Sequence, residues 1–276
     1  MDPLTHAISG WALARALPGQ RLPKKQVFLL ALLAMAPDAD YVLILFSDVI
    51  YLQYHRGITH SLLMLPLWTW LLYSLLPGRR VQQPVMPWLV GGALLTHIFL
   101  DLITAYGTMI LAPFSDWRAS LDLIFIIDPL FTLCLLLPLL PAVAWKRHGR
   151  KPGMISLALA SAYIGLAAWN HERAIAVARK EIPRAIQVDA LPMPFSPFHW
   201  QVIVDASETS FARTVVDLAP ALPDVSGLLP AAFAQRFITP GPADTFQWQS
   251  FMKMESNVSW GEKVDGVDFY HWFARY

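Results

Sequence analysis

Apolar residues gather in long runs along this chain instead of alternating with polar residues. A helix needs roughly 20 apolar residues to cross a hydrocarbon core of about 30 Å. Three runs reach that length and two shorter ones approach it with their flanking residues, which predicts about five transmembrane helices. The stretch from Leu4 to Leu17 predicts a short N-terminal helix, either a half-span or an interfacial helix. The five runs cover residues 27–46, 62–76, 85–104, 124–145 and 154–169.

The pattern changes in the C-terminal part of the chain. Residues 198–204 and 211–218 alternate apolar with polar positions and are rich in β-branched residues, which is typical of strands. Short segments with aromatic residues near the end of the chain predict further strands. We therefore predict a mainly α, polytopic membrane helix bundle over residues 1–175, which carries a metal site. A small β-rich extracytoplasmic domain is predicted over residues 176–276.

Composition supports a membrane setting and excludes some classes of function. Charged residues make up 15% of the chain, against about 25% in a typical soluble domain, and the mean hydropathy is +0.43. The 21 basic and 20 acidic residues nearly cancel, so the chain lacks the basic excess expected of a nucleic-acid binder. The single cysteine, Cys134, excludes an intrachain disulfide framework.

Basic residues mark one side of the predicted bundle. If all five runs cross the membrane, three basic clusters fall on the same side, and the positive-inside rule places that side in the cytoplasm. The C-terminal domain then lies outside the cytoplasm, which predicts a multi-pass protein of the bacterial inner membrane. The clusters comprise Arg15, Arg21, Lys24 and Lys25; Arg79 and Arg80; and Lys146, Arg147, Arg150 and Lys151.

Two carboxylates interrupt the first long apolar run. Asp38 and Asp40 follow Pro37 in the sequence PDAD, and charged groups inside membrane spans are costly enough to indicate function. A straight helix would place these two side chains about 200° apart. Pro37 should break the helix, because proline removes a backbone donor and clashes with the preceding turn. We therefore expect both carboxylates to face one cavity, with a structural carboxylate pair as the alternative.

A histidine and an aspartate lie near the end of the third run. His97 and Asp101 are four residues apart, which places both side chains on one helix face. Such a pair can supply two ligands to one metal ion, or a carboxylate that orients a ligating imidazole. A pair that only stabilises its helix is the alternative.

The loop after the first run has the sequence HRGITHS. His55 and His60 offer imidazoles, which are common zinc ligands, and the Arg56 guanidinium can bind phosphate or carboxylate with two hydrogen bonds. Gly57 lets the backbone turn so that the two imidazoles can converge. His6 lies in the N-terminal stretch DPLTHAISG and reaches the same depth if that stretch enters from the outer side. For HRGITHS the alternative is an interfacial loop with lipid-facing Arg and His, and for His6 alone it is an ordinary surface or packed histidine.

All these polar groups are expected near the outer face of the membrane, which predicts one metal site built from several helices. Histidine and carboxylate ligands suit one or two zinc ions, with manganese as the alternative, and the metal would activate a water as nucleophile. Arg56 would bind an anionic group of the substrate, and His55 or Asp40 would move a proton. The predicted catalytic residues are thus Asp40, His55 and Arg56, and the predicted metal ligands are His6, Asp38, His60, His97 and Asp101.

Several motifs together resemble the YdjM/DUF457 family of bacterial inner-membrane proteins. They are DPLTHAISG, PDAD, HRGITHS, HIFLD with the following TAYGT, and PFS…D…FIIDP, and they span roughly residues 1–170. The resemblance implies a membrane-bound, metal-dependent hydrolase. The order of His6, Asp38, His60 and the His97–Asp101 pair is also similar to the ligand order in zinc-dependent phospholipase C and the S1/P1 nucleases, which are all-α phosphoesterases. The later H…H-x-x-x-E pair of those enzymes has no counterpart in this sequence.

The predicted function is a membrane-bound, metal-dependent hydrolase that cleaves a lipid or lipid-linked phosphoester at the outer face of the inner membrane. Membrane lipids and the lipid substrate are the expected partners. Two alternatives stay open: a proton- or ion-coupled transporter that uses the Asp/His cluster as a relay, and a structural envelope protein with a stabilising metal. The small number of runs and the lack of an inverted repeat disfavour the transporter.

Overall fold

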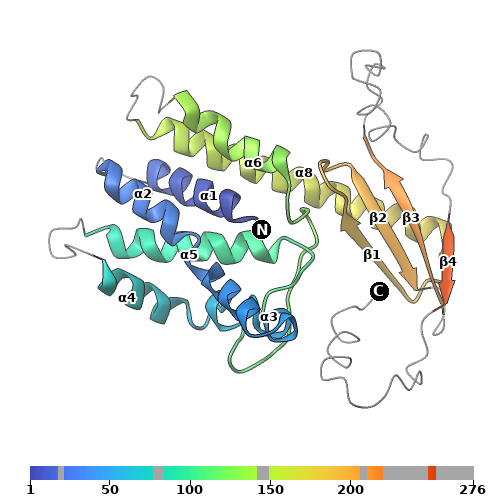
Figure 1. The fold of residues 1–276 in the computed structure, drawn as a ribbon. Coiled ribbons are helices and arrows are strands. Elements are labelled where there is room, and N and C mark those ends of the chain that lie inside the picture. Colours follow the sequence, from blue (N-terminus) through green and yellow to red (C-terminus); the bar gives the residue numbers. More distant parts are fainter. Residues whose placement is uncertain (18–21, 77–83, 142–148, 206–209, 220–247, 253–276) are drawn as a thin grey trace.

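The computed structural model describes residues 1–17, 22–76, 84–141, 149–205, 210–219 and 248–252. A helical bundle is joined to a small antiparallel sheet (Figure 1), which confirms the mainly helical class with a β-rich C-terminal part. In the bundle, α4 (Leu65–Leu75) packs on α5 (Met86–Leu102). The N-terminal helix α1 (Pro3–Ala16) packs against α2 (Lys24–Leu33), α5, α6 (Pro129–Leu136) and α8 (Lys151–Glu181).

Two glycines let α1 lie very close to its neighbours. Gly10 faces Ala34, and a Cβ added to this glycine would lie 2.6 Å from the Ala34 Cβ. A Cβ added to Gly153 of α8 would lie 2.4 Å from the Ala16 backbone nitrogen. Small residues at such contacts allow helix backbones to approach in an apolar environment. This close packing encloses His6, near the start of α1, which has no exposed surface.

The first long apolar run is bent. α2 ends at Leu33, and the 3₁₀ helix η1 (Ala36–Leu45) continues at an angle of 47° to it. Pro37 at the start of η1 explains the predicted break, because proline cannot donate to the preceding turn. A 3₁₀ helix has three residues per turn, so Asp38 and Asp40 point in directions about 120° apart. The two carboxylates nevertheless share one group with His55, and Asp38 belongs to a second group as well.

Among the described residues, α8 alone is long and apolar enough to cross a membrane as one helix, and it has 31 residues. Two bent pairs raise the number of candidate spans to three if each pair counts as one. The first pair is α2 with η1; the second is the segment of α3 (Asp48–Tyr54) and η2 (Ile58–His60) with α4, bent by 81°. α5 and the segment formed by α6 and η4 (Leu137–Leu139) are apolar but shorter.

The sheet is antiparallel with strand order β1-β2-β3-β4. β2 (His199–Asp205) and β3 (Ser210–Asp217) confirm the two strands predicted from alternation. β1 (Gln187–Pro192) lies in a proline-rich segment whose composition does not predict a strand. β4 (Gln249–Met252) belongs to the final aromatic segment, and the predicted strands after it lie in residues 253–276, outside the described residues.

One continuous helix connects the bundle to the sheet. The predicted domain boundary at residue 175 falls inside α8, which runs unbroken to Glu181. Its last turns carry Ala174 and Ala178, which pack against Trp200 of the sheet. The sheet therefore rests on the end of a bundle helix.

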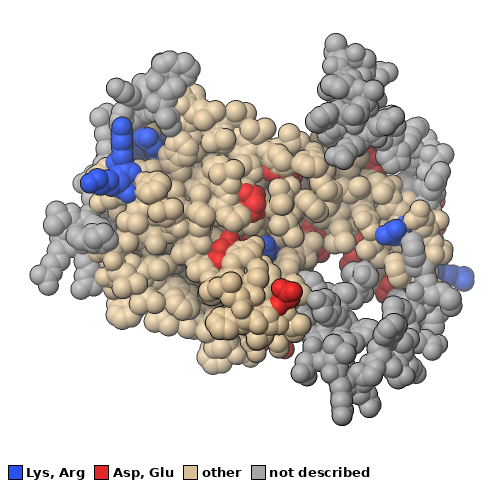
Figure 2. Space-filling view, in the orientation of Figure 1, with Lys and Arg blue, Asp and Glu red and all other residues tan. Residues whose placement is uncertain are grey.

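Basic and acidic side chains separate along the bundle. Figure 2 shows the largest group of Lys and Arg at the end of the bundle far from the sheet, with single basic residues near the middle and on the sheet. Here α1 ends with Arg15, α2 begins at Lys24 and α8 begins at Lys151. The carboxylates of the predicted site lie toward the opposite end, where α5 ends. Other members of the predicted basic clusters lie outside the described residues: Arg21, Arg79, Arg80, Lys146 and Arg147.

Candidate metal centre

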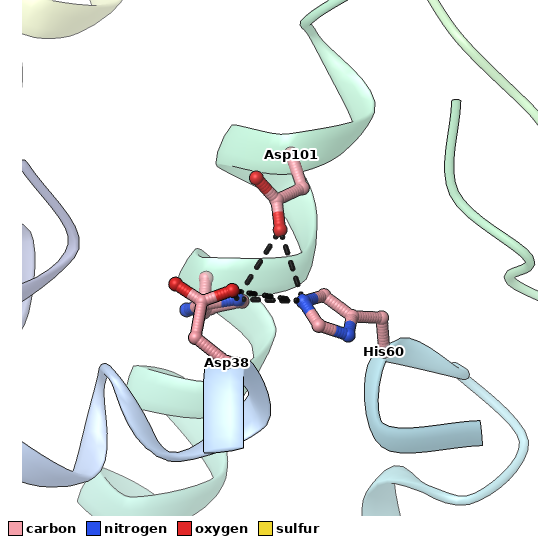
Figure 3. Close-up of side chains that lie close together, drawn as sticks. Asp38, His60 and Asp101 are labelled. Carbon is pink, nitrogen blue, oxygen red and sulfur yellow. Dashed lines mark hydrogen bonds and ion pairs between the residues drawn. The ribbon is translucent and has the colours of Figure 1, made fainter. Parts of the chain in front are cut away.

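Four side chains from three separate elements converge in the interior. Asp38 comes from η1, His60 from η2, and His97 and Asp101 from one face of α5 (Figure 3). The Nε2 atoms of His60 and His97 lie 3.1 Å and 3.2 Å from Asp101 Oδ2, and 2.9 Å from each other. Asp38 Oδ1 lies 3.5 Å from His60 Nε2 and 3.6 Å from His97 Nε2. One ligand atom of each residue lies within 4.8 Å of all the others, so the group could hold a metal ion.

The hydrogen bonds around this group fit a cation. His97 Nδ1 lies 2.6 Å from the Ala34 carbonyl oxygen, which can only accept, so Nδ1 carries the proton and Nε2 presents a lone pair. Asp101 Oδ2, which faces both imidazoles, is buried and accepts no hydrogen bond from the described part of the chain, and Asp38 Oδ2 is also buried without a donor there. Buried acceptors without donors are costly unless a cation binds them. Nitrogen and oxygen ligands of this kind suit a divalent metal.

His6 lies against this group. Its ring stacks on the ring of His97, with centroids 3.7 Å apart and an angle of 20° between the planes. His6 Nε2 is 3.4 Å from Asp101 Oδ1, and both ring nitrogens are buried without a hydrogen-bond partner among the described residues. The structure thus brings the five predicted ligands together, with His6 beside the four-residue group that best fits one ion.

Asp38 also belongs to a second group, with Asp40 and His55. Asp40 Oδ1 accepts a hydrogen bond from His55 Nδ1 at 2.8 Å, and Oδ2 accepts from the Arg56 backbone nitrogen at 3.1 Å. A carboxylate that holds the Nδ1 proton of a histidine fixes the ring and leaves Nε2 unprotonated. Since Asp38 is shared, the geometry is compatible with one ion or with two neighbouring ions.

The Arg56 side chain is buried and directed at Asp101. Its Nη2 lies 2.8 Å from Asp101 Oδ1, and its Nη1 donates to the Thr104 hydroxyl at 2.8 Å. The guanidinium also lies over the Tyr106 ring, 4.8 Å from its centroid. Arg56 adopts a φ of +58°, a costly backbone conformation that persists where the surrounding structure imposes it. The guanidinium predicted to bind a substrate anion is therefore also a partner of a predicted ligand.

Arg118 contributes hydrogen bonds to the backbone near the candidate centre, a role that the sequence does not reveal. Its guanidinium donates to carbonyl oxygens around the C-terminal end of α3, at Leu52, Gln53 and His55, over 3.0–3.1 Å. Burial lowers the pKa of Arg118 and raises the pKa of the neighbouring Tyr106 phenol, because both charged forms lose solvation. The sequence carries no signal for this role, since all three acceptors are backbone atoms.

The other polar residues of the outer segments have separate roles. Asp128 caps α6 by accepting from Leu130 and Phe131 nitrogens, and it accepts from the Tyr163 hydroxyl at 2.7 Å. Asp122 is in neither candidate metal group, and burial raises the pKa of its carboxyl group. His171 packs edge-on against Trp200, away from the centre.

The part of the chain that holds α1, η1, η2 and α5 matches a known family. The family of YdjM inner membrane proteins matches residues 1–174, which contain every candidate ligand. The chain belongs to this family. The predicted family and its inner-membrane setting are thereby confirmed.

One relative is the uncharacterized protein YfhP of Bacillus subtilis (strain 168), 32% identical over 174 residues. That match covers 60% of this chain and 52% of YfhP, so the chain matches about half the length of this relative. No solved structure matches the chain significantly.

Proposed function

We propose that this protein is a metal-dependent hydrolase of the inner membrane that cleaves a lipid or lipid-linked phosphoester. The observation that carries the proposal is the convergence of Asp38, His60, His97 and Asp101, because one possible ligand atom of each residue lies within 4.8 Å of all the others. Zinc is the expected ion because the donors are imidazole nitrogens and carboxylate oxygens, and manganese is the alternative. The family membership supports the membrane setting and, with it, a lipid substrate.

The charges of the side chains support a divalent ion. Asp38, Asp40 and Asp101 bring three carboxylates together, and the cationic groups that contact them are the Arg56 guanidinium and the Met1 amino group, both at Asp101. The carboxylates outnumber these groups, so a divalent cation would offset the excess negative charge and make the site more attractive to a phosphate group. A bound cation supplies Lewis acidity toward a phosphoryl oxygen and an attacking water.

The remaining chemistry falls to side chains around the cation site. Asp40 holds the Nδ1 proton of His55, so His55 Nε2 is free to take up a proton and return it to a leaving group. Arg56 stabilises the Asp101 carboxylate and keeps a positive charge beside the position of a substrate anion. The apolar surroundings exclude water, which strengthens each of these electrostatic interactions.

We propose further that the chain crosses the membrane about five times, with the basic end in the cytoplasm and the candidate site and sheet on the outer side. The separation of Arg15, Lys24 and Lys151 from the carboxylates along the bundle supports this orientation. In a Cys134→Ser background, a membrane-impermeant maleimide should label Asp116→Cys in spheroplasts, and Gly149→Cys only after lysis. Labelling of both before lysis, or of Gly149→Cys alone, would refute the orientation.

A purely structural metal is the competing function, and one observation favours it. His60, His97 and Asp101 have no exposed surface, as is common for structural metal sites that leave no position for substrate. Asp38 retains slight exposure, 9% for its side chain, which marks the side from which a phosphate could approach. The two functions differ in whether the metal is needed for turnover or only for stability.

Detergent-purified protein tests the proposal directly. Metal analysis should find one or two equivalents of zinc or manganese, lost in His97→Ala and in His60→Ala. His199→Ala is the matched control, because His199 lies in the sheet beside Asp217, and it should keep its metal. Phospholipids and polyprenyl phosphates are then assayed as substrates with the same four proteins. Metal retained in both ligand variants would refute the site, and metal without hydrolysis of either lipid class would favour the structural function.

A further inference from the structure

Thr59 lies between the two candidate groups and contacts both. Its Oγ1 donates to Asp40 Oδ2 at 2.8 Å, and the same Oγ1 lies 2.9 Å from His60 Nδ1. Thr59 is half-buried in the short helix η2, one residue before the predicted ligand His60. A single hydroxyl therefore joins the carboxylate that holds His55 to the imidazole that faces Asp38 and Asp101.

The direction of these hydrogen bonds follows from the number of protons available. A hydroxyl has one proton to donate, and a carboxylate oxygen can only accept. Asp40 also accepts from His55 Nδ1 and from the Arg56 backbone nitrogen, so it acts as an acceptor in each of these contacts. The Thr59 proton is thus directed to Asp40, and its oxygen is left to accept from His60.

His60 must then carry its proton on Nδ1. Its Nε2 is then the nitrogen that faces the cation site, 2.9 Å from His97 Nε2 and 3.1 Å from Asp101 Oδ2. The opposite tautomer would place a proton on Nε2, where it would occupy the position of a cation. His97 reaches the same tautomer by a different route, because its Nδ1 donates to the Ala34 carbonyl.

We propose that Thr59 is a positioning residue that holds the ring proton of His60 on Nδ1, so that Nε2 is the nitrogen directed at the cation site. The proposal rests on the metal centre of the proposed function, but the Nδ1 proton is a property of the metal-free protein as well. Asp40 Oδ2 lies 3.5 Å from His60 Nδ1 and accepts from Thr59, so one carboxylate orients His55 directly and supports His60 through the Thr59 hydroxyl. Partners behind metal-ligating histidines commonly fix their tautomers in this way.

Two substitutions separate the hydroxyl from the shape of the side chain. Thr59→Val keeps the branched shape and removes the hydroxyl, and Thr59→Ser keeps the hydroxyl. Zinc affinity, measured by chelator competition on the full chain in detergent, should fall by about 10–100-fold in Thr59→Val and stay near the wild-type value in Thr59→Ser. Thr96→Val is the matched control, since the Thr96 hydroxyl donates only to the Gly92 carbonyl of its own helix.

The tautomer itself is measured by ¹⁵N NMR of histidine-labelled, metal-free protein, with the His60 signal assigned from its loss in His60→Gln. In the wild type and in Thr59→Ser, Nδ1 of His60 should be protonated; in Thr59→Val, a measurable fraction of His60 should lose the Nδ1 proton. An unchanged His60 spectrum in Thr59→Val would overturn the proposal, and so would wild-type zinc affinity in that variant. The spectrum requires neither metal nor substrate, so a failure of the proposed hydrolase activity is distinguishable from a failure of this inference.

Discussion

Replacing Asp101 with asparagine removes one negative charge from the candidate metal centre while keeping the shape of the side chain. Asp101 is fully buried, its Oδ1 lies 2.8 Å from Arg56 Nη2, and the Met1 amino group contacts the same oxygen. The imidazoles of His60 and His97 face its Oδ2. Asp101→Asn therefore changes both the stability of the metal-free protein and its affinity for metal.

In the metal-free protein the main effect falls on Arg56. Removing one partner of a buried ion pair destabilises a protein by about 3–5 kcal/mol, because the other charge stays buried without compensation. Arg56 keeps the Thr104 hydroxyl as an acceptor, so we expect a loss near the lower end, about 3 kcal/mol. Since 1 kcal/mol shifts Tm by roughly 2–4 °C in chains of about this length, Tm should fall by about 6–12 °C.

Metal binding adds a second, independent difference in Tm between the wild type and Asp101→Asn. A ligand at 100 times its Kd stabilises the folded state by about 2.7 kcal/mol, which corresponds to a rise in Tm of roughly 5–11 °C. The wild type should show this rise when zinc is added. Asp101→Asn should show little of it at the same zinc concentration, because it loses the carboxylate that lies nearest to both imidazoles.

Thermal unfolding in detergent, with chelator and then with excess zinc, measures both differences in one experiment. Asp116→Asn is the control, since it removes the same charge from an exposed loop position and should leave both Tm values unchanged. The reasoning is refuted if Asp101→Asn unfolds at the wild-type temperature in chelator and gains the same stabilisation from zinc. If Asp101→Asn is less stable in chelator but gains the full stabilisation from zinc, the result supports the ion pair with Arg56 and rejects Asp101 as a metal ligand.

Two further predictions concern the packing that holds the centre in place. Gly153→Ala should lower Tm through overpacking that costs about 1–3 kcal/mol, because the new Cβ would lie 2.4 Å from the Ala16 nitrogen. Gly165→Ala in the same helix is the control: its new Cβ would have nothing within 4 Å, so this variant should unfold at or above the wild-type temperature. Equal Tm values for the two variants would contradict the close contact of α1 with α8. Arg118→Ala should speed limited proteolysis of the segment 105–123, while the metal content of the protein, measured in parallel, stays at the wild-type level. If the variant loses its metal instead, Arg118 supports the metal centre itself.

The parts of the centre that sequence could predict share one property: a polar residue in an apolar context. His97 and Asp101 fall on one face of α5 because helix periodicity fixes their spacing, and Pro37 signals the break that redirects Asp38. These features depend on residues near one another in the chain. The convergence of η1, η2 and α5 was predicted only as a shared depth in the membrane.

The parts that sequence could not predict depend on backbone geometry or on ordinary residues. Arg56 reaches Asp101 from a left-handed backbone conformation, which no pattern of residue types encodes. Thr59 looks like any polar loop residue until its hydroxyl is found between a carboxylate and an imidazole. The sequence does not predict β1, because the prolines around it argue against a strand. Pro192, however, lies at the end of β1, where a missing backbone donor costs little.

The unbroken course of α8 has a mechanical consequence. Thirty-one residues at about 1.5 Å each give a rod of about 46 Å, against about 30 Å for the hydrocarbon core. About 16 Å of helix is left to project from the bilayer, and its tip is packed into the sheet through Ala174 and Ala178. The sheet is therefore held at a fixed distance from the membrane surface, unlike a domain joined by a flexible linker. A tilt of α8 within the bundle would move the sheet sideways, so α8 and the sheet should move as one rigid body.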